Sequence, residues 1–275
     1  MANTLARHED GSLELHITIP QEKIKQANDQ VMAKVISTAK VPGFRPGKAP
    51  KKVVEDSTDQ AKVREEVLKQ LIPELYIEAV QEHKLKPIVN PKIHVDSVDE
   101  DKDWEFTATT CEMPKVEIGE YKKAVKEITA KSKIAVPGKE AEKPNLDELV
   151  KAVVDNVKVT IPKLLIEYEA ERLLSQTLDE IKRLGLSLDQ YLSSTNKTPE
   201  ALRKDYEDRA THDMTVEFAL SQIADSEKIS VDPKEIEEAI QKAKDPAEKA
   251  QMESNKYLLS SILRQQKTLD FLQNL

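Results

Sequence analysis

The densest cluster of glycine and proline in this 275-residue chain reads Val41-Pro42-Gly43-Phe44-Arg45-Pro46-Gly47-Lys48-Ala49-Pro50. Glycine tolerates positive φ, whereas proline fixes φ at about −65°. A proline also pushes the residue before it toward extended geometry, so Pro46 should hold Arg45 out of the helical region. The pattern therefore predicts a tight loop with Phe44 and Arg45 at its tip.

The charged residues around this loop are all positive. No aspartate or glutamate occurs from Gln30 to Val54, although the whole chain has a net charge of −8. The simpler interpretation is that this stretch only connects two helices, because glycine and proline are common in loops of every kind. The charge pattern instead favours a local basic surface around an exposed aromatic side chain. Because the chain as a whole is acidic, any contact with RNA should be confined to this surface. Its basic residues are Lys34, Lys40, Arg45, Lys48, Lys51 and Lys52.

The first part of the chain is expected to be an α+β domain. Apolar and polar residues alternate from Leu13 to Ile19, which indicates a half-buried strand. Apolar residues at helical spacing predict helices over 24–40 and 63–80, the second kinked at Pro73. A short helix is expected over 50–55, and residues 87–98 and 104–108 read as two further strands. Residues 1–115 should thus form an antiparallel sheet with helices.

At the loop, six positions match the pattern Gly-Phe-Arg-x-Gly-Lys-x-Pro. This pattern resembles the ribosome-docking signature of trigger factor, the bacterial chaperone that meets nascent chains at the ribosomal exit tunnel. The order strand, helix, loop, helix, strand, strand is similar to the ribosome-binding domain of that family. The resemblance implies that the loop contacts a protein and RNA of the large ribosomal subunit. Pro46 stands where some relatives carry lysine, which leaves one charge fewer for RNA. The expected ribosome-binding residues are Gly43, Phe44, Arg45, Pro46, Gly47, Lys48 and Pro50.

The middle of the chain departs from the family. Trigger factors typically carry a peptidyl-prolyl isomerase domain of the FK506-binding type near this point, with aromatic residues around a proline pocket. Between Met113 and Pro144 the one aromatic residue is Tyr121. We therefore expect the isomerase domain to be absent and residues 116–144 to be an extended segment and linker. In this interpretation Tyr121, Val125 and Ile128 lie on a strand, and residues 135–144 form the linker.

Residues 145–275 are expected to form an all-α domain with helical arms. Asn145 is a good N-cap for a helix over 146–156. The next helix should start near Ile161 and stop at Gly185. A single last helix should carry the apolar residues from Tyr257 to Leu272. The remaining helix starts are marked by Thr198-Pro199, Asp232-Pro233 and Asp245-Pro246.

A helical domain with an apolar inner face would make a cradle for unfolded chains. Burying apolar client surface contributes about 25 cal/mol per Å², before ordering costs. The candidate client-binding residues are Met214, Phe218, Tyr257 and Leu269. Periodicity cannot separate a cradle from the core of a helix bundle, and the core interpretation is favoured for each of the four.

The sequence offers no pattern typical of a catalytic, cofactor or metal site. The five histidines are scattered, and none pairs with another histidine or with a cysteine at ligand spacing. Cys111 is the one cysteine, so it excludes a disulfide framework and is interpreted as a small packing residue. No serine or cysteine lies in a nucleophile elbow, and no glycine-rich loop could hold phosphate.

The resemblance to trigger factor, taken with these observations, implies an ATP-independent holdase that docks on the ribosome and shields nascent chains. No secretory signal opens the chain and no run of about 18 apolar residues occurs, so a cytoplasmic protein without membrane contact is expected. A peptidyl-prolyl isomerase, as in full-length trigger factors, stays open as an alternative, although the aromatic pocket is missing. A periplasmic chaperone resembling SurA is the other alternative, and the docking loop argues against it. A weak homodimer is also left open.

Overall fold

The structure is a computed structural model, and it describes residues 3–39, 44, 50, 53–54, 58–99, 102–132, 144–243 and 245–275. The chain divides into two compact units, each with its own apolar core. The first unit comprises Met1–Met113 and Pro162–Leu165, and the second comprises Pro114–Ile161 and Ile166–Leu275. Within the described ranges, no helix combines the length and the apolar content that crossing a membrane requires.

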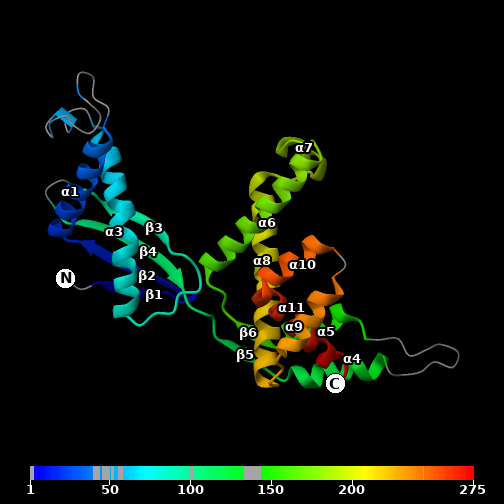
Figure 1. The fold of residues 1–275 in the computed structure, drawn as a ribbon. Helices are drawn as coiled ribbons and strands as arrows, with labels where there is room; N and C mark the ends of the chain where they lie inside the picture. Colours follow the sequence, from blue (N-terminus) through cyan, green and yellow to red (C-terminus); the bar gives the residue numbers. More distant parts are fainter. Residues whose placement is uncertain are drawn as a thin grey trace. The chain divides into compact units, whose positions relative to one another are not determined.

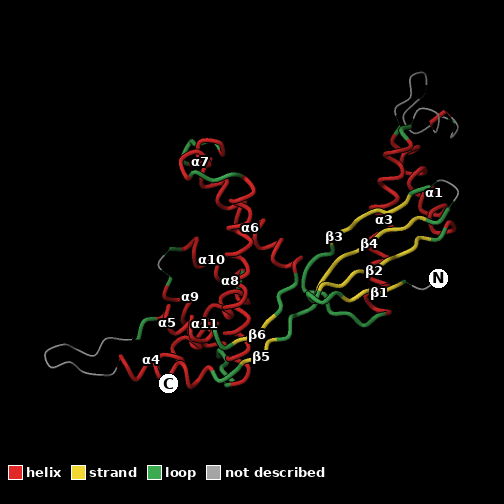
Figure 2. The backbone as a smooth tube through the Cα atoms, turned by 180° about the vertical axis from the view of Figure 1, so that it is seen from behind, coloured by secondary structure: helices red, strands yellow, loops and turns green. Residues whose placement is uncertain are grey.

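The first unit is built on a four-stranded antiparallel sheet with the order β1-β2-β4-β3 (Figures 1 and 2). The strand predicted over Leu13–Ile19 is confirmed, and its apolar positions are buried. The third strand is shorter than the predicted span of 87–98, and its pairing shifts between Val95 and Ser97. The strands are β1 (Thr4–Arg7), β2 (Ser12–Ile19), β3 (Lys92–Ser97) and β4 (Trp104–Cys111).

Two helices, α1 (Gln21–Thr38) and α3 (Gln60–Glu82), cover one face of this sheet (Figure 1). Their buried side chains join those of β2 and β4 in one cluster, and Phe106 is its largest fully buried member. The side chain of Asp59 caps α3 by accepting a hydrogen bond from the Ala61 amide at 3.0 Å. Pro73 lies inside α3, and the helix continues through it. The two helices therefore close the core over the sheet.

The chain from Pro114 onward is mostly helical and also contains a short antiparallel pair, β5 (Val116–Ile118) with β6 (Val157–Val159). The predicted fold class, an α+β domain followed by a helical domain with arms, is confirmed. The described helices are α4 (Tyr121–Ser132), α5 (Leu146–Val154), α6 (Lys163–Arg183), α7 (Leu188–Thr195), α8 (Pro199–Ser226), α9 (Pro233–Lys242), α10 (Pro246–Ser254) and α11 (Lys256–Gln273).

The core of the second unit forms where α4, α5, α8 and α11 meet. The strand expected for Tyr121, Val125 and Ile128 is wrong, because these residues lie on α4 and the extended part ends at Ile118. Spacings of four and then three residues put the three side chains on one face of a helix, which packs into this core. The rest of the expected linker, residues 133–143, lies outside the described residues. The buried members are Tyr121, Val125, Leu149, Val153, Ala219, Leu220, Ile223 and Leu272.

Capping residues start the later helices as the sequence predicts. The side chains of Asn145, Thr198, Asp232 and Asp245 each accept a hydrogen bond from a first-turn backbone amide. The single last helix expected after Asp245-Pro246 is wrong, because the chain breaks at Asn255 and forms α10 and α11. The short helix α7 was not predicted. The second unit is therefore a chain of short and long helices with well-defined starts.

A polar contact between α4 and the end of α8 makes stability depend on pH. Tyr121 donates a hydrogen bond to Oε1 of Glu227 at 3.0 Å, and Nζ of Lys122 lies 2.6 Å from the same oxygen. The hydrogen bond from Lys122 lowers the pKa of Glu227 below its usual range. The contribution of the carboxylate is therefore present at neutral pH and is lost as the pH falls through this lowered pKa.

We expect Glu227→Gln to lower the free energy of unfolding by about 1 kcal/mol at neutral pH. The difference from the wild type should shrink in acid, since the wild-type carboxyl then also becomes neutral. Chemical denaturation at neutral pH and at about pH 3, below the ordinary pKa of glutamate, measures both values. Glu207→Gln, which breaks the exposed pair with Arg203, serves as the control and should cost less. An equal difference at both pH values would contradict the assignment.

Candidate functional surfaces

The glycine- and proline-rich stretch Val41–Pro50 lies between α1 and α3 in the sequence. Among the predicted ribosome-binding residues, the structure describes Phe44, which is 44% exposed, and Pro50, which is also exposed. The remaining positions stay a prediction, because they lie outside the described residues. They are Gly43, Arg45, Pro46, Gly47 and Lys48.

Val54, which follows this stretch, is buried and has 1% of its surface exposed. The carbonyl oxygen of Pro50 accepts hydrogen bonds from the amides of Val53 and Val54 at 3.0 and 3.2 Å. Within the short helix expected over 50–55, these two valines are helical, and residues 51, 52 and 55 lie outside the described part. The exposed Phe44 is thus followed along the chain by a buried valine.

The four candidate client-binding residues differ in exposure. Tyr257, at the start of α11, is 92% exposed. Met214 and Phe218 lie one turn apart on α8 and are half-buried. Leu269 packs against the core of the second unit, which favours the core interpretation for this residue. The structure therefore leaves Tyr257 as the member of this set that presents most of its surface to solvent.

Three leucines at the turn between α6 and α7 form an exposed apolar surface that sequence reasoning missed. Leu184, Leu186 and Leu188 are 75%, 44% and 39% exposed, and we call them the tip leucines. Gly185 has a φ of 74°, and the amide of Leu186 donates to the Ile181 carbonyl at 3.1 Å, so α6 ends in a Schellman motif. A helix stop flanked by leucines was the signal that could have revealed this surface.

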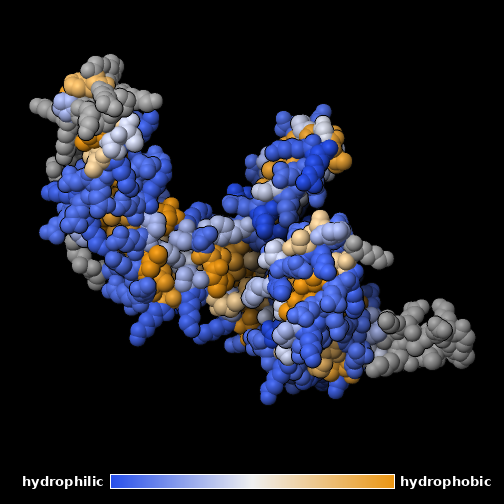
Figure 3. Space-filling model, viewed as in Figure 1, coloured by the Kyte–Doolittle hydropathy of each residue, from blue (hydrophilic) through white to orange (hydrophobic). Residues whose placement is uncertain are grey.

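A second exposed apolar surface lies on α11. Leu258 and Ile262 are 59% and 51% exposed and follow Tyr257 along the helix. We call these three residues the α11 surface. Figure 3 shows apolar residues at the α7 end and in the region of α9 to α11, within a mostly hydrophilic surface. Apolar side chains that remain exposed in groups are typical of sites that bind other molecules.

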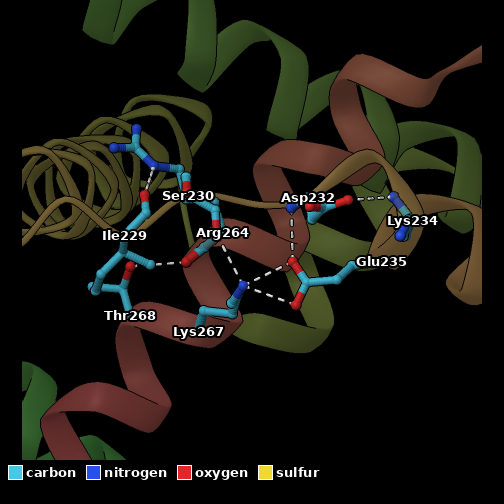
Figure 4. Close-up of polar contacts among 8 residues, drawn as sticks. All are labelled: Ile229, Ser230, Asp232, Lys234, Glu235, Arg264, Lys267 and Thr268. Atoms are coloured by element: carbon cyan, nitrogen blue, oxygen red, sulfur yellow. Dashed lines mark hydrogen bonds and ion pairs between the residues drawn. The ribbon is translucent and has the colours of Figure 1, made fainter.

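Two cations on α11 hold the connection between α8 and α9 (Figure 4). Nε of Arg264 donates to the carbonyl oxygen of Ile229 at 2.9 Å. Nζ of Lys267 donates to the carbonyl oxygen of Ser230 at 2.9 Å. Both carbonyl groups lie beyond the end of α8, where the helix no longer provides partners for them. The two side chains therefore replace the missing backbone hydrogen bonds.

The same lysine reaches the first turn of α9. Nζ of Lys267 lies 2.8 and 2.9 Å from the two carboxylate oxygens of Glu235. Oε2 of Glu235 also accepts a hydrogen bond from the Asp232 amide at 2.8 Å, which completes a capping box at the start of α9. We call Arg264 and Lys267, with the groups they bind in this connection, the α11 latch.

The one thiol of the chain, that of Cys111, packs in the protein interior. Cys111 is fully buried at the end of β4, and burial together with the charge of Asp10 raises its pKa to about 11. The thiol is therefore protonated at neutral pH and a poor nucleophile. Within the described residues, no three side chains of His, Cys, Asp or Glu gather closely enough to hold a metal ion.

Comparison with known proteins gives two family matches that meet in the middle of the chain. The family described as bacterial trigger factor protein matches residues 1–149, and the family described as the trigger factor C-terminus matches residues 123–274. The trigger factors of Staphylococcus carnosus and Natranaerobius thermophilus are 36% and 31% identical over 122 residues. This stretch is 44% of the present chain, and 28% and 27% of those proteins. The chain therefore matches little more than a quarter of the length of these curated relatives.

The fold as a whole is similar to a solved structure titled "Promiscuous Substrate Recognition in Folding and Assembly Activities of the Trigger Factor Chaperone". The TM-score is 0.68, and the match covers 100% of this chain and 99% of the other. At 14% sequence identity, this similarity establishes the fold alone. Family membership comes from the two family matches, each of which covers more than half of the sequence. The chain belongs to the bacterial trigger factor family.

Proposed function

We propose that this protein is an ATP-independent chaperone that docks at the ribosomal exit tunnel and holds nascent chains in the cytoplasm. The pair of adjoining family matches, over residues 1–149 and 123–274, carries this proposal. Docking would use the loop from Gly43 to Pro50, where the exposed Phe44 stands in a basic segment. A protein and RNA of the large ribosomal subunit would be its partners.

In this proposal residues 1–115 dock, residues 145–275 hold clients, and no isomerase domain lies between them. The two family matches overlap over residues 123–149, which supports a docking part followed directly by a client-holding part. The exposed apolar groups, which are the tip leucines and the α11 surface, support client holding, because apolar contact with an unfolded chain needs no nucleotide. The similar structure is described as recognising substrates promiscuously, as such contacts allow.

The docking loop can be tested with the double variant Phe44→Ala and Arg45→Glu. We expect this variant to lose ribosome association, because it removes the exposed aromatic side chain and reverses the charge next to it. Binding of the wild type should also weaken as salt rises, since its basic residues face RNA phosphates. Co-sedimentation with ribosomes at low and high salt measures both effects.

A matched control makes the same kinds of change away from the loop. Ile77 on α3 is 54% exposed, and Lys25 on α1 is exposed. The double variant Ile77→Ala and Lys25→Glu should sediment with ribosomes as the wild type does. If the loop variant kept its full association while remaining folded, the docking assignment would be wrong.

A further inference from the structure

The helices α9 and α10 bury little apolar surface. Ile240 is the one buried residue of α9, and α10 has none within its described residues. α9 packs on α11 and on α10. Segments with few buried apolar contacts open at low free energy, independently of the rest of a protein. The α9–α10 hairpin therefore depends on other contacts to stay in place.

The α11 latch supplies those contacts. Lys267 binds both the Ser230 carbonyl and the Glu235 carboxylate, and Arg264 binds the Ile229 carbonyl, so both cations act on the connection that leads into α9 (Figure 4). The side chains of Lys267 and Glu235 are 39% and 42% exposed. Water and salt therefore reach this ion pair, and its strength depends on competing charges.

Two leucines on α11 share a face of the helix with Lys267 of the latch. Leu259, Leu263 and Lys267 are spaced four residues apart, so they share one face of the helix. Lys267 contacts Glu235, so this face is directed toward α9. Leu259 and Leu263 are only half-buried, and this face continues into the exposed α11 surface. Opening of the hairpin would extend that surface by one more row of leucines.

α9 packs on α11 and contacts Lys267, so its side chains indicate what else could bind this face of α11. α9 offers Glu235 to Lys267, and next to it the apolar Ile236 and Ile240, one turn apart. We propose that the α9–α10 hairpin is an internal substitute for a client, and that an apolar polypeptide segment with an adjacent acidic residue displaces it. The carboxylate of the client takes the place of Glu235 on Lys267, and its apolar side chains cover Leu259 and Leu263.

This inference rests on the proposed chaperone function and names the class of client that the site selects. The two charge partners of the latch can be separated by substitution. Glu235→Gln weakens the hold on α9, keeps the capping box and leaves the cation on α11 for an acidic ligand. Lys267→Met weakens the same hold but removes the cation. Glu207→Gln, on an exposed ion pair of α8, is the matched control.

Two measurements on the full chain test the inference. Hydrogen exchange of residues 233–254 should be about five- to tenfold faster in Glu235→Gln and in Lys267→Met, and unchanged in the control variant. A fluorescent peptide with the sequence of residues 232–243 is the probe for the vacated face of α11. It should bind Glu235→Gln several-fold more tightly than the wild type, and Lys267→Met should show no such gain.

Any result that differs from these expectations contradicts the inference. Unchanged exchange in both variants would mean that the latch does not hold the hairpin, and faster exchange throughout α8 and α11 would mean general destabilisation. Equal peptide binding by Glu235→Gln and Lys267→Met would mean that no acidic group is recognised. Suppression of client aggregation by the wild type tests the proposed chaperone function separately. A wild type that suppresses aggregation, with variants that fail the exchange and peptide tests, would refute this inference alone.

Discussion

Replacing Phe106 with alanine should lower the free energy of unfolding of the first unit by about 3–5 kcal/mol. Phe106 is 1% exposed and lies in β4, between Ile17 of β2 and Val95 of β3 in the register of the sheet. Its ring is the largest fully buried side chain beneath α1 and α3, so truncation leaves a cavity that the sheet cannot close. Because domains are typically stable by about 5–15 kcal/mol, this loss brings the unit close to unfolding.

A single spectroscopic probe reports on this unit. Trp104 is the one tryptophan of the chain, and it is buried in β4 of the same core. Denaturant unfolding followed by its fluorescence therefore measures the first unit, whereas far-UV circular dichroism reports mostly on the helices of the second. Phe44→Ala removes the same ring from an exposed position and should change the fluorescence midpoint little. Equal midpoints for the two variants would contradict the cavity argument.

Replacing Leu149 with alanine should lower the free energy of unfolding of the second unit by about 2–5 kcal/mol. Leu149 is fully buried on α5, within the cluster that also contains residues of α4, α8 and α11. Its loss creates a cavity at the junction of four helices, which cannot all move to fill it. The expected result is a lower midpoint in far-UV circular dichroism with an unchanged Trp104 transition.

The matched control for this variant lies on the same helix. Leu146 is 42% exposed, and Leu146→Ala makes the same chemical change without a cavity. A small effect at Leu146 and a large one at Leu149 would place α5 in the core by its energetics as well as by its contacts. Similar small effects at both positions would mean that α5 is a peripheral helix.

The parts of the fold that depend on local chemistry could be predicted from the sequence. The strand Ser12–Ile19 follows from strict alternation, and the starts of α5, α8, α9 and α10 follow from capping side chains. These signals act within one turn of helix or along one strand. They therefore need no knowledge of the tertiary structure.

The predictions from sequence are wrong where tertiary contacts determine the local structure or the burial of a residue. The strand expected for Tyr121, Val125 and Ile128 is wrong, because their spacing fits a helix and α4 packs into the core of the second unit. The break at Asn255 has neither glycine nor proline to mark it. Leu269 and Tyr257 lie on the same helix, yet one packs on the core and the other is almost fully exposed. No periodicity distinguishes them, because burial depends on which helices pack nearby.

The buried position of Cys111 makes the protein a convenient host for site-specific labels. The thiol is fully buried and its pKa is raised to about 11, so maleimide reagents should leave it unmodified while the first unit remains folded. A cysteine introduced at an exposed residue such as Tyr257 or Leu184 would then be the one site that reacts. Crosslinkers and fluorophores could be attached there without first removing the native cysteine. Labelling of Cys111 itself would report each opening of the sheet.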